Sequence, residues 1–597
     1  MIKHYTIRTL ILAASGIWVA CSGHEYPGPL TPEEALNSFH LQQGFVIETL
    51  ASEPLINDPV DVTFDEFGNF FVVEMLDYPY KPAPGTARSR IRYLEDTDAD
   101  GRFDHAVVFE DSLNEATSIL PWKEGLLVCA APDILYLKDT DGDMVADTKE
   151  VVFTGFFDNN SEAQITNLKF NVDNWIYASN YGHPGEIRYL GDTESPVVSI
   201  KGTDFRFRLD QGKFEPAAGS TQFGQAIDDW GNRFGTQNTI RISQIVIPWR
   251  YLVRDTTMKP TAPVVNIAGD DLEMFQLTPA PYWRAERTER RQKRYDEQGL
   301  DRKEWAEDHF TGCSGGTIYN GGLFPEKYYG TVFIGEVSGN LVHRDQLNEG
   351  KGPLFQAVRA PEDQQSEFLV SSDSWFRPAN LEVAPDGSLL VVDMYRQHIE
   401  TPLSIPEDLK EDMDFYHGDD MGRIYRIYPQ QSEFSDFKYP GEMTSSELVS
   451  TLEHANGWWR LTAQRLLVER ADSSVIEQVL DKYMNSSSAL ARLHSLFVLE
   501  ALGGVSEEVI LQALQDPHPQ LRIRGLQFAE THSDFLSELI KLSIDQDKRV
   551  QFQLALSLGY FQGEEVESIL EQLSRKFADD PWFQTAIDSR VKTESQL

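Results

Sequence analysis

The chain has 597 residues, with 94 Asp or Glu against 53 Lys or Arg, so its formal net charge at pH 7 is −41. This charge argues against nucleic acid and against an anionic membrane surface as direct partners. The length predicts two or more domains, and a hydrophobic content of 41% is ample for packed cores. Three cysteines occur without a CxxC or CxxCH motif, which excludes a zinc ribbon and a covalently attached c-type haem. Cys129 and Cys313 either form a disulfide in an oxidising compartment or are two buried thiols.

Residues 1–20 are typical of an export signal. Lys3 and Arg8 precede an apolar run at 9–20 that is too short to span a bilayer. Small residues before Cys21 resemble a bacterial lipobox, although Trp18 stands where Leu is usual. We therefore expect a lipoprotein of the bacterial cell envelope, in the outer membrane or facing the periplasm. Its only membrane attachment would be a lipid on Cys21, followed by a tether over 21–43; a plain signal peptide is the alternative.

A hairpin pattern recurs along residues 44–430. Its clearest form is 381–392, where two β-rich runs flank Pro385-Asp386-Gly387; Pro presets φ and Gly accepts a positive φ. Copies surround Gly68, Asn174 and Gly231, and looser relatives lie at 118–129 and 317–343. Six such units predict radial repetition of small sheets, a six-bladed β-propeller. A large β-sandwich or several β domains are the alternative.

Two features complete this prediction. Residues 44–50 and 422–428 alternate like strands, and pairing them in one blade would close the ring and remove its free edges. An insert at about 251–309 breaks the rhythm and carries the basic stretch 283–294. That stretch is either an arm over the active face that attracts an anionic substrate or cofactor, or a solvated helix with i,i+4 ion pairs to Glu286 and Glu289.

Strand periodicity stops near Ser445, and amphipathic helical segments follow. They return in pairs, and the stretch 516–526, DPHPQLRIRGL, resembles the signature of HEAT-type repeats. We expect an all-α, HEAT-like solenoid over 445–597, with a helical bundle as the alternative. Such arrays bind a protein partner or pack against a neighbouring domain.

Two acidic loops resemble the calcium loops of EF-hand-like and thrombospondin-type repeats. Carboxylates at alternating positions of a tight loop converge on a hard cation, because a divalent ion relieves their repulsion. The second loop has Met144 where an EF-hand has its turn glycine. We predict structural calcium that braces loops of neighbouring blades; solvated acidic turns are the alternative. The ligands would be Asp96, Asp98, Asp100 and Asp104 in the first loop and Asp139, Asp141, Asp143 and Asp147 in the second.

Polar residues gather at the strand ends opposite the hairpin turns. A propeller would bring these ends together around one mouth of its channel and form a pocket there. For any single residue, capping of a turn is the alternative. We assign catalysis to His183, Arg377, Arg396 and Asp393, because His beside Arg and a carboxylate suits proton abstraction from a hydroxyl with Arg stabilising the oxyanion. The predicted binding residues are Asp61, Glu74, Asn167, Asn180, Gln237, Asn380, Tyr395 and His398.

Oxidation of a hydroxyl would also need a cofactor, because no side chain accepts a hydride. The sequence has no GxGxxG motif at a strand–helix junction, so a nicotinamide cofactor is unsupported.

The stretches 309–344, 375–400 and 422–427 resemble the N-terminal propeller of the planctomycete-type membrane-bound dehydrogenases, also called PVC-type haem-binding CxxCH proteins. The two Asp loops and DNWIY at 173–177 match as well, so the resemblance covers about 44–429. It implies a six-bladed propeller similar to the quinone-dependent glucose/sorbosone dehydrogenases, HEAT repeats and a cytochrome c domain. The missing CxxCH departs from this pattern.

The resemblance further implies a sugar or polyol substrate and pyrroloquinoline quinone as cofactor, without haem. Electrons would pass to a separate cytochrome or quinone acceptor. His183 is the nearest candidate for the catalytic His of the quinone enzymes. A non-catalytic carbohydrate- or protein-binding propeller and a polysaccharide lyase or hydrolase stay open as alternatives.

Overall fold

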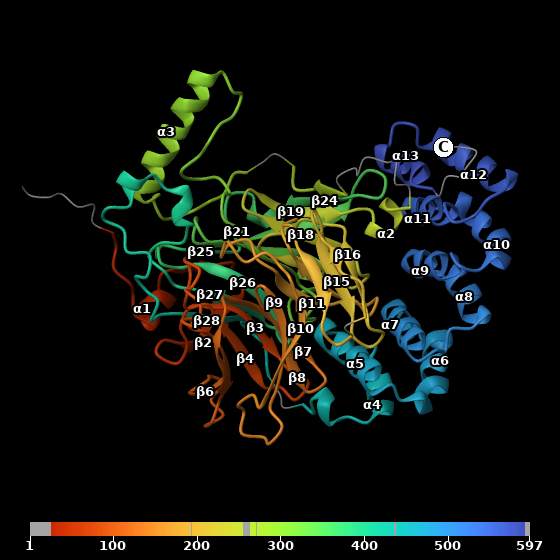
Figure 1. The fold of residues 1–597 in the computed structure, drawn as a ribbon, viewed down its shortest axis with the longest axis horizontal. Coiled ribbons are helices and arrows are strands. Elements are labelled where there is room, and N and C mark those ends of the chain that lie inside the picture. Colours follow the sequence, from red (N-terminus) through yellow and green to blue (C-terminus); the bar gives the residue numbers. More distant parts are fainter. Residues whose placement is uncertain (1–25, 193, 255–262, 270–271, 435–436, 591–597) are drawn as a thin grey trace, which may run out of the picture.

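The structure is a computed structural model that describes residues 26–192, 194–254, 263–269, 272–434 and 437–590. Its strands form six antiparallel sheets, and a helical region follows them along one side (Figure 1). The proposed signal and the lipidation site at Cys21 lie outside the described residues. Among the helices that are described, none has both the length and the apolar character needed to cross a bilayer.

The first three sheets follow one another along the chain. Blade 1 consists of β3 (Pro59–Phe64), β4 (Phe70–Glu74), β5 (Ser89–Glu95) and β6 (His105–Leu113). Blade 2 consists of β7 (Ala116–Trp122), β8 (Gly125–Ala130), β9 (Asp133–Lys138), β10 (Thr148–Thr154), β13 (Glu186–Tyr189) and β14 (Val198–Ser199). Blade 3 consists of β11 (Thr166–Phe170), β12 (Ile176–Ser179), β15 (Asp204–Arg208) and β16 (Lys213–Ala217).

The other three sheets complete the ring. Blade 4 consists of β17 (Gln225–Ile227), β18 (Arg233–Gln237), β19 (Ile240–Ile245) and β20 (Val264–Asn266). Blade 5 consists of β21 (Cys313–Ile318), β22 (Val332–Glu336), β23 (Leu341–Glu349), β24 (Phe355–Arg359), β25 (Leu369–Ser371) and β1 (Phe39–Leu41). Blade 6 consists of β26 (Pro378–Val383), β27 (Leu389–Asp393), β28 (Arg423–Pro429) and β2 (Phe45–Ser52).

The ring closes through blade 6, as the sequence predicts. The early strand β2 pairs antiparallel with the late strand β28, with Phe45 opposite Pro429 and Ser52 opposite Arg423. Apolar side chains from adjacent sheets fill the spaces between blades; Val72 of β4 and Val392 of β27, for example, belong to one fully buried cluster. The six-bladed β-propeller is therefore confirmed, and strand pairing within the chain closes its ring.

Three sequence expectations need correction. Part of the predicted tether is folded, since α1 (Pro32–Leu36) and β1 lie within it and β1 pairs with β25 of blade 5. Part of the predicted insert belongs to the ring, since β20 is the outer strand of blade 4. Cys129 and Cys313 are buried free thiols, so the disulfide alternative is wrong. Each thiol packs in the apolar cluster of its own blade.

Ten α-helices form the helical region after the propeller. They are α4 (Ser445–Thr451), α5 (Gly457–Arg470), α6 (Ile476–Asn485), α7 (Ala489–Ala501), α8 (Glu507–Leu514), α9 (Pro519–Ala529), α10 (Leu536–Lys541), α11 (Lys548–Leu558), α12 (Glu564–Lys576) and α13 (Pro581–Asp588). Helices α5, α7, α9, α11 and α13 pack side by side in one row, and each of these also packs against one helix of a second row. The helices follow a curved array in Figure 1.

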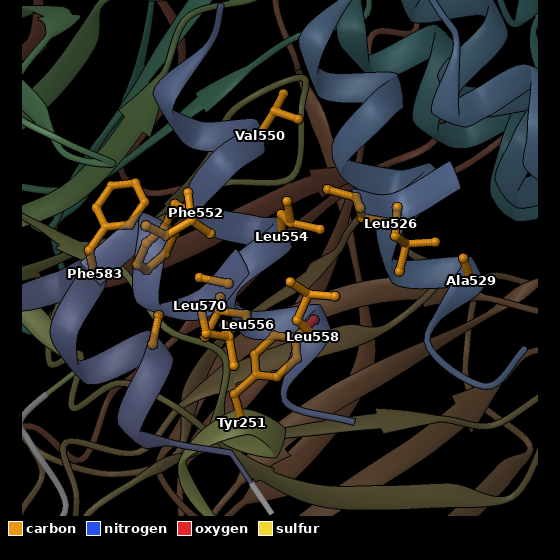
Figure 2. Packing of buried hydrophobic residues seen from close by; sticks show 14 of the residues in the cluster. Tyr251, Leu526, Ala529, Val550, Phe552, Leu554, Leu556, Leu558, Leu570 and Phe583 are labelled. Atoms are coloured by element: carbon orange, nitrogen blue, oxygen red, sulfur yellow. The ribbon is translucent and has the colours of Figure 1, made fainter. Parts of the chain in front are cut away.

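The helical region and the propeller share apolar cores. The short helix α2 (Trp249–Leu252) leaves blade 4 and inserts Tyr251 beneath Leu556 and Leu558 of α11 (Figure 2). The buried Tyr251 hydroxyl donates to Glu530 Oε1 at 2.5 Å. At a second contact, Val172 of blade 3 packs among the residues of α4 to α9. These contacts dock the array against the ring.

Helix α5 closes one end of the propeller channel. The innermost strands of all six blades line a small internal cavity of about 160 Å³, and Trp458, Leu461, Thr462 and Arg465 of α5 complete its wall. Arg465 donates to Glu66 of blade 1 at 2.9 Å, and both side chains are almost fully buried. Among the described residues, α5 thus covers the channel at the end near the hairpin turns. The opposite mouth, where the innermost strands begin, is not covered by α5.

Candidate functional site

A continuous belt of hydrogen bonds joins the innermost strands where they begin. Register shifts mark five of these six strands at this level, in β3, β7, β11, β21 and β26. A bulge turns side chains out of the regular alternation, which here directs them toward the adjacent blade. We call these contacts the inter-blade belt. They run from Asp61 Oδ2 to Ile119 N, Ser118 Oγ to Leu168 N, Asn167 O to Gln225 Nε2, Phe223 O to Gly315 N, Ser314 Oγ to Pro378 O, and Asn380 Nδ2 to Asp61 Oδ1.

The belt explains three residues that the sequence assigns to ligand binding. Asp61 and Asn380 direct their side chains to each other, so their main role is to join blades. Asn167 contributes its backbone carbonyl to the belt, while its side-chain Oδ1 is buried without a partner. Asn167 also has a φ of 51°, the left-handed region that Asn tolerates better than most residues. Strain of this kind often marks a functional position.

A cavity of about 600 Å³ lies above the belt, at the open mouth of the channel. We call it the mouth cavity. Its floor consists of residues at or just before the innermost strands, and its wall consists of the loop 160–164, helix α3 (Tyr282–Gln298) and the segment that follows α3. The volume lies in the range typical of small-molecule sites. The polar and charged residues that line it include Asn160, Glu162, Gln164, Asn167, Gln222, Arg284, Arg287, Arg291, Arg302, Lys303, Glu304, Asn380 and Glu400.

Three amide oxygens of this cavity are buried without a hydrogen-bond donor: Gln164 Oε1, Asn167 Oδ1 and Gln222 Oε1. The amide nitrogens of the two glutamines are already used, since Gln164 Nε2 donates to Glu115 at 2.7 Å and Gln222 Nε2 donates to the carbonyl of Glu162 at 3.3 Å. These bonds fix which end of each amide is free. The cavity therefore offers three oriented acceptors, and a buried acceptor without a donor costs free energy that a hydroxyl-rich ligand would recover.

Glu162 is the carboxyl group of this cavity best suited to proton transfer. The buried Tyr78 hydroxyl donates to its Oε1 at 2.6 Å. Burial, and after it the charge of Glu400, raise the pKa of Glu162 to about 7. Glu400 itself accepts from Arg287 at 2.7 Å. A carboxyl group with a pKa near neutrality can accept or donate a proton at physiological pH.

Helix α3 supplies the cationic wall of the mouth cavity. It stands out from the propeller in Figure 1, and its inner face buries Trp283, Arg284 and Arg287. On its outer face Arg290 pairs with Glu286 at 2.8 Å, the i,i+4 contact that one of the two alternatives predicts. One face of α3 thus lines the cavity, and the other is solvated and carries the ion pair of the second alternative. Attraction of an anionic substrate or cofactor stays a prediction.

The four residues predicted to be catalytic do not line the mouth cavity. Arg396 is fully buried in a bidentate ion pair with Asp58, with nitrogen–oxygen distances of 2.5 and 2.6 Å. Arg377 donates to three backbone carbonyls, and Asp393 accepts the backbone N–H groups of Arg377 and Tyr395. The ring of His183 stacks on Phe157 at 3.9 Å between centroids, and burial lowers its pKa. The pocket predicted from these four residues therefore does not coincide with the mouth cavity, and their catalytic role stays a prediction.

Five predicted binding residues also serve the fold, because strand ends supply many of the hydrogen bonds between loops. Their side chains contact the following groups: Glu74 with Arg90, Arg92 and Asn57 N; Asn180 with the carbonyls of His183 and Thr203; Gln237 with the carbonyl of Ser220; Tyr395 with Asp373; and His398 with the ring of Tyr26. None of the five lines the mouth cavity. For these residues the capping alternative describes the structure.

The acidic loops keep three carboxylates each in a common position. Oxygens of Asp96, Asp98 and Asp100 lie within 4.8 Å of one another, and so do those of Asp139, Asp141 and Asp147. Asp104 lies outside the first group and accepts from Thr97 Oγ1 at 2.6 Å, while Asp143 lies outside the second and accepts from Val145 N. Each loop contacts a neighbouring blade, through Phe103 N to Leu50 O at 2.9 Å and Ala146 N to Phe109 O at 2.8 Å.

The sequence analysis missed Glu162, Gln164 and Gln222, and it included Arg284 and Arg287 only as part of the basic stretch 283–294. The glutamate and the two glutamines lie in loops that enter the innermost strands β11 and β17, outside the hairpins on which the sequence was aligned. A polar run, 159–164, directly before a predicted innermost strand was the available indication.

The fold and the cavity together define a six-bladed β-propeller protein with a ligand-sized cavity at one mouth of its channel. The profile of a family described as a domain of unknown function, DUF7133, matches residues 31–431. This match covers more than half of the chain, and the protein belongs to that family. No curated protein matches the chain in sequence.

Solved structures with a similar fold have low identity to this chain. A luciferin-regenerating enzyme is 10% identical with a TM-score of 0.36, and the match covers 66% of this chain and 99% of that one. The pyranose dehydrogenase PQQ domain from Coprinopsis cinerea is 13% identical with a TM-score of 0.35, covering 65% and 97%. A glucose dehydrogenase is 13% identical with a TM-score of 0.33, covering 64% and 99%. Because these scores are low, the fold assignment rests on the strand pairing of this chain.

Proposed function

We propose that the mouth cavity binds a carbohydrate-type ligand, rich in hydroxyl groups. The observation that carries this proposal is the set of three buried amide oxygens, on Gln164, Asn167 and Gln222, that have no donor. Sugar hydroxyls would donate to them, and the other hydroxyl oxygens would accept from the arginines of α3. Leaving a buried acceptor unpaired costs about 1–3 kcal/mol, so three in one cavity favour a ligand that pairs with all of them.

The reaction that we propose is oxidation of a ligand hydroxyl, in which Glu162 accepts the hydroxyl proton. A quinone such as pyrroloquinoline quinone, when bound, would supply the two-electron oxidant that removal of the carbon-bound hydrogen requires. The residues present fit a polycarboxylated quinone, because Arg291, Arg302 and Lys303 line the cavity beyond Arg287. The electrons would leave to a separate cytochrome or quinone acceptor.

The experiment is a paired measurement of binding and turnover. Calorimetry with a panel of neutral and acidic oligosaccharides tests binding, and dye reduction in the presence of the quinone and calcium tests oxidation. Gln164→Ala and Gln222→Ala should weaken binding about 5- to 150-fold each if each acceptor loses about 1–3 kcal/mol. The matched control is Gln298→Ala, because Gln298 is exposed at the end of α3 and does not line the cavity. Absence of binding across the panel would overturn the proposal.

The outcomes also separate the alternatives. Binding without turnover would favour a non-catalytic carbohydrate-binding propeller. An unsaturated product that absorbs in the ultraviolet would identify a lyase, and shortened oligosaccharides without it would identify a hydrolase.

The helical region is proposed to be HEAT-like and to bind a protein partner. Arg492 of α7 forms a bidentate contact with Asp516, which precedes α9, and Arg522 of α9 repeats this contact with Asp545, which precedes α11. The recurrence of this contact between successive helix pairs supports the proposal. The envelope location and the lipid on Cys21 are proposals that rest on the sequence pattern alone.

We further propose that the two acidic loops bind structural calcium. Three carboxylates per loop lie close enough to share one ion, and each loop already contacts the adjacent blade. Calcium would remove the repulsion that raises the pKa of Asp141, which comes first from Asp143 and then from Asp147.

A further inference from the structure

The wall of the mouth cavity has more cations than carboxylates, although the whole protein is strongly acidic. Arg284, Arg287, Arg291, Arg302 and Lys303 line it together with three carboxylates, those of Glu162, Glu304 and Glu400. The five cations exceed the three carboxylates by two. The sign of this local charge is opposite to the net charge of −41, so the cavity differs from the surface around it.

Ion pairs within the wall account for three of these cations. Arg287 donates to Glu400 at 2.7 Å. Arg291 and Arg302 each lie 3.5 Å from an oxygen of Glu304. Among the residues that the structure describes, the two cations of the wall left without a carboxylate partner are Arg284 and Lys303.

Arg284 is buried, with 5% of its surface exposed, and its hydrogen bonds go only to neutral groups. Its Nε donates to the carbonyl of Ala306 at 3.0 Å, and Nη2 donates to Thr311 Oγ1. Within the described residues, Nη1 has no acceptor. Glu336 acts on Arg284 through its charge, but its oxygens accept instead from the backbone N–H groups of Thr311, Gly312 and Ser338.

Lys303 lies in the segment that follows α3, at the exposed rim of the cavity. Its Nζ is 3.4 Å from the centre of the Trp305 ring, and no carboxylate lies within ion-pair distance of it among the described residues. The indole ring attracts the ammonium group without neutralising it. Lys303 therefore keeps a full charge at the entrance.

We propose that the mouth cavity selects an anionic carbohydrate, a sugar acid or an oligosaccharide that contains uronic acid residues, whose carboxylate pairs with Arg284. A buried guanidinium that forms no direct ion pair is costly, and the Glu336 carboxylate is already occupied by backbone N–H groups. A ligand carboxylate would supply the ion pair together with an acceptor for Nη1. Lys303 raises the local concentration of such a ligand at the rim. This inference rests on the proposed carbohydrate binding and adds the charge of the ligand to it.

The carboxylates of the cavity wall do not strongly repel one more negative group. Glu304 and Glu400 are neutralised by arginines, and the remaining carboxyl, Glu162, accepts the Tyr78 hydroxyl. At about neutral pH, Glu162 is protonated in a large fraction of molecules, because its pKa is about 7. Its repulsion of an acidic ligand is therefore weaker than that of an ordinary glutamate.

The test is calorimetry on the full chain without added quinone, with a galacturonic acid trisaccharide and a neutral galactose trisaccharide as probes. The acidic probe should bind about 10- to 100-fold more tightly than the neutral one, since a hydrogen-bonded charge pair contributes that much. Arg284→Gln should remove this preference, so that the two probes bind with about equal affinity, and Arg284→Lys should restore part of it. Arg290→Gln is the matched control, because Arg290 lies on the outer face of the same helix and does not line the cavity.

Each outcome decides the inference. Equal affinity for the two probes would overturn the inference while the proposed carbohydrate binding stands, and absence of binding by both would overturn both. If Arg284→Gln does not fold, two other measurements decide: the Lys303→Gln variant at the exposed rim, and the salt dependence of the wild type. In both, affinity for the acidic probe should fall, with the variant or with added salt, and affinity for the neutral probe should not. If Arg284→Gln weakens binding of pyrroloquinoline quinone alone and spares the acidic preference, Arg284 recognises the cofactor and the inference is wrong.

Discussion

Asn380 Nδ2 lies 2.7 Å from Asp61 Oδ1, and this contact joins the last blade of the ring to the first. The other oxygen of the same carboxylate accepts from Ile119 N of blade 2 at 3.1 Å. One buried side chain thus connects three consecutive blades. The strand pairing of β2 with β28 closes the ring at its outer part, and this contact closes it at the channel.

Asn380→Ala should lower the free energy of unfolding by about 1–3 kcal/mol, because it removes one of the two donors to a buried oxygen of Asp61 and leaves only Val62 N. Urea denaturation followed by circular dichroism measures this. Asn348→Ala at an exposed position of β23 is the control, with an expected change below about 0.5 kcal/mol. Equal effects of the two substitutions would show that the belt contributes nothing at this position.

Arg396→Met should destabilise the fold by about 3–5 kcal/mol, because it leaves Asp58 charged and buried without its partner. Thermal unfolding monitored by intrinsic fluorescence measures the loss. The variant protein that remains folded should bind carbohydrate with wild-type affinity, since Arg396 does not line the mouth cavity. A normal melting temperature combined with lost binding would instead restore Arg396 to the functional site.

Oxidation should depend on the ionised form of Glu162, whose pKa is about 7. We therefore expect kcat/KM to rise with pH through about pH 7 and then to level off. Glu162→Gln should remove this rise and lower kcat about 10²- to 10⁴-fold, the usual contribution of a general base. The control is Glu286→Gln, on the outer face of α3. A wild-type pH profile in Glu162→Gln would contradict the assignment.

His343 should give the fold a pH-dependent stability. It is fully buried between Glu367 at 2.7 Å and Asp345 at 3.0 Å, which together raise its pKa against the effect of burial. Because the pKa of His343 is raised in the folded state, its protonation stabilises the fold fully below the unfolded-state pKa, about 6.5. This stabilisation is lost as the pH rises through the pKa of His343 in the folded state. The pKa of Asp345 is lowered to about 2, so its own contribution is present above about pH 4 and is lost as the pH falls through about 2.

Urea unfolding at a series of pH values checks this prediction. His343→Gln should flatten the decline above about pH 6.5 and should lower stability by about 1–3 kcal/mol below it. Asp345 and Glu367 each lose one cationic partner but keep Arg241 and Arg359, respectively. His105→Gln, at an exposed position, serves as the control and should leave the profile unchanged. A wild-type decline that persists in His343→Gln would assign the dependence to another group.

Removing calcium should lower the melting temperature if the acidic loops hold the ion in the folded state alone, because binding to the native state stabilises it by mass action. Scanning calorimetry with a chelator and then with excess calcium measures the difference. Asp98→Asn and Asp141→Asn should each reduce the response, whereas Asp111→Asn, outside both clusters, should keep it. Identical melting curves with and without calcium would identify the loops as solvated turns.

The periodic pattern of the sequence determined the fold class and even the closure of the ring. Recurrent turns such as Pro385-Asp386-Gly387 limit the local backbone to hairpins, and the β2 and β28 runs alternate apolar and polar residues as paired strands do. The change to helical periodicity near Ser445 was equally readable. These features are local, so a short window of the chain contains the physical information that specifies them.

The site was decided by tertiary structure. Asn167 and Asn380 were found because they lie in the aligned hairpins, but a polar residue at a strand end looks the same whether it faces a ligand or an adjacent blade. Arg396 and Glu162 show the difference. Arg396 is neutralised by Asp58, 338 residues away in sequence, whereas burial and the charge of Glu400 raise the pKa of Glu162. Burial and charge compensation depend on which distant segments meet, and the sequence pattern alone does not encode that meeting.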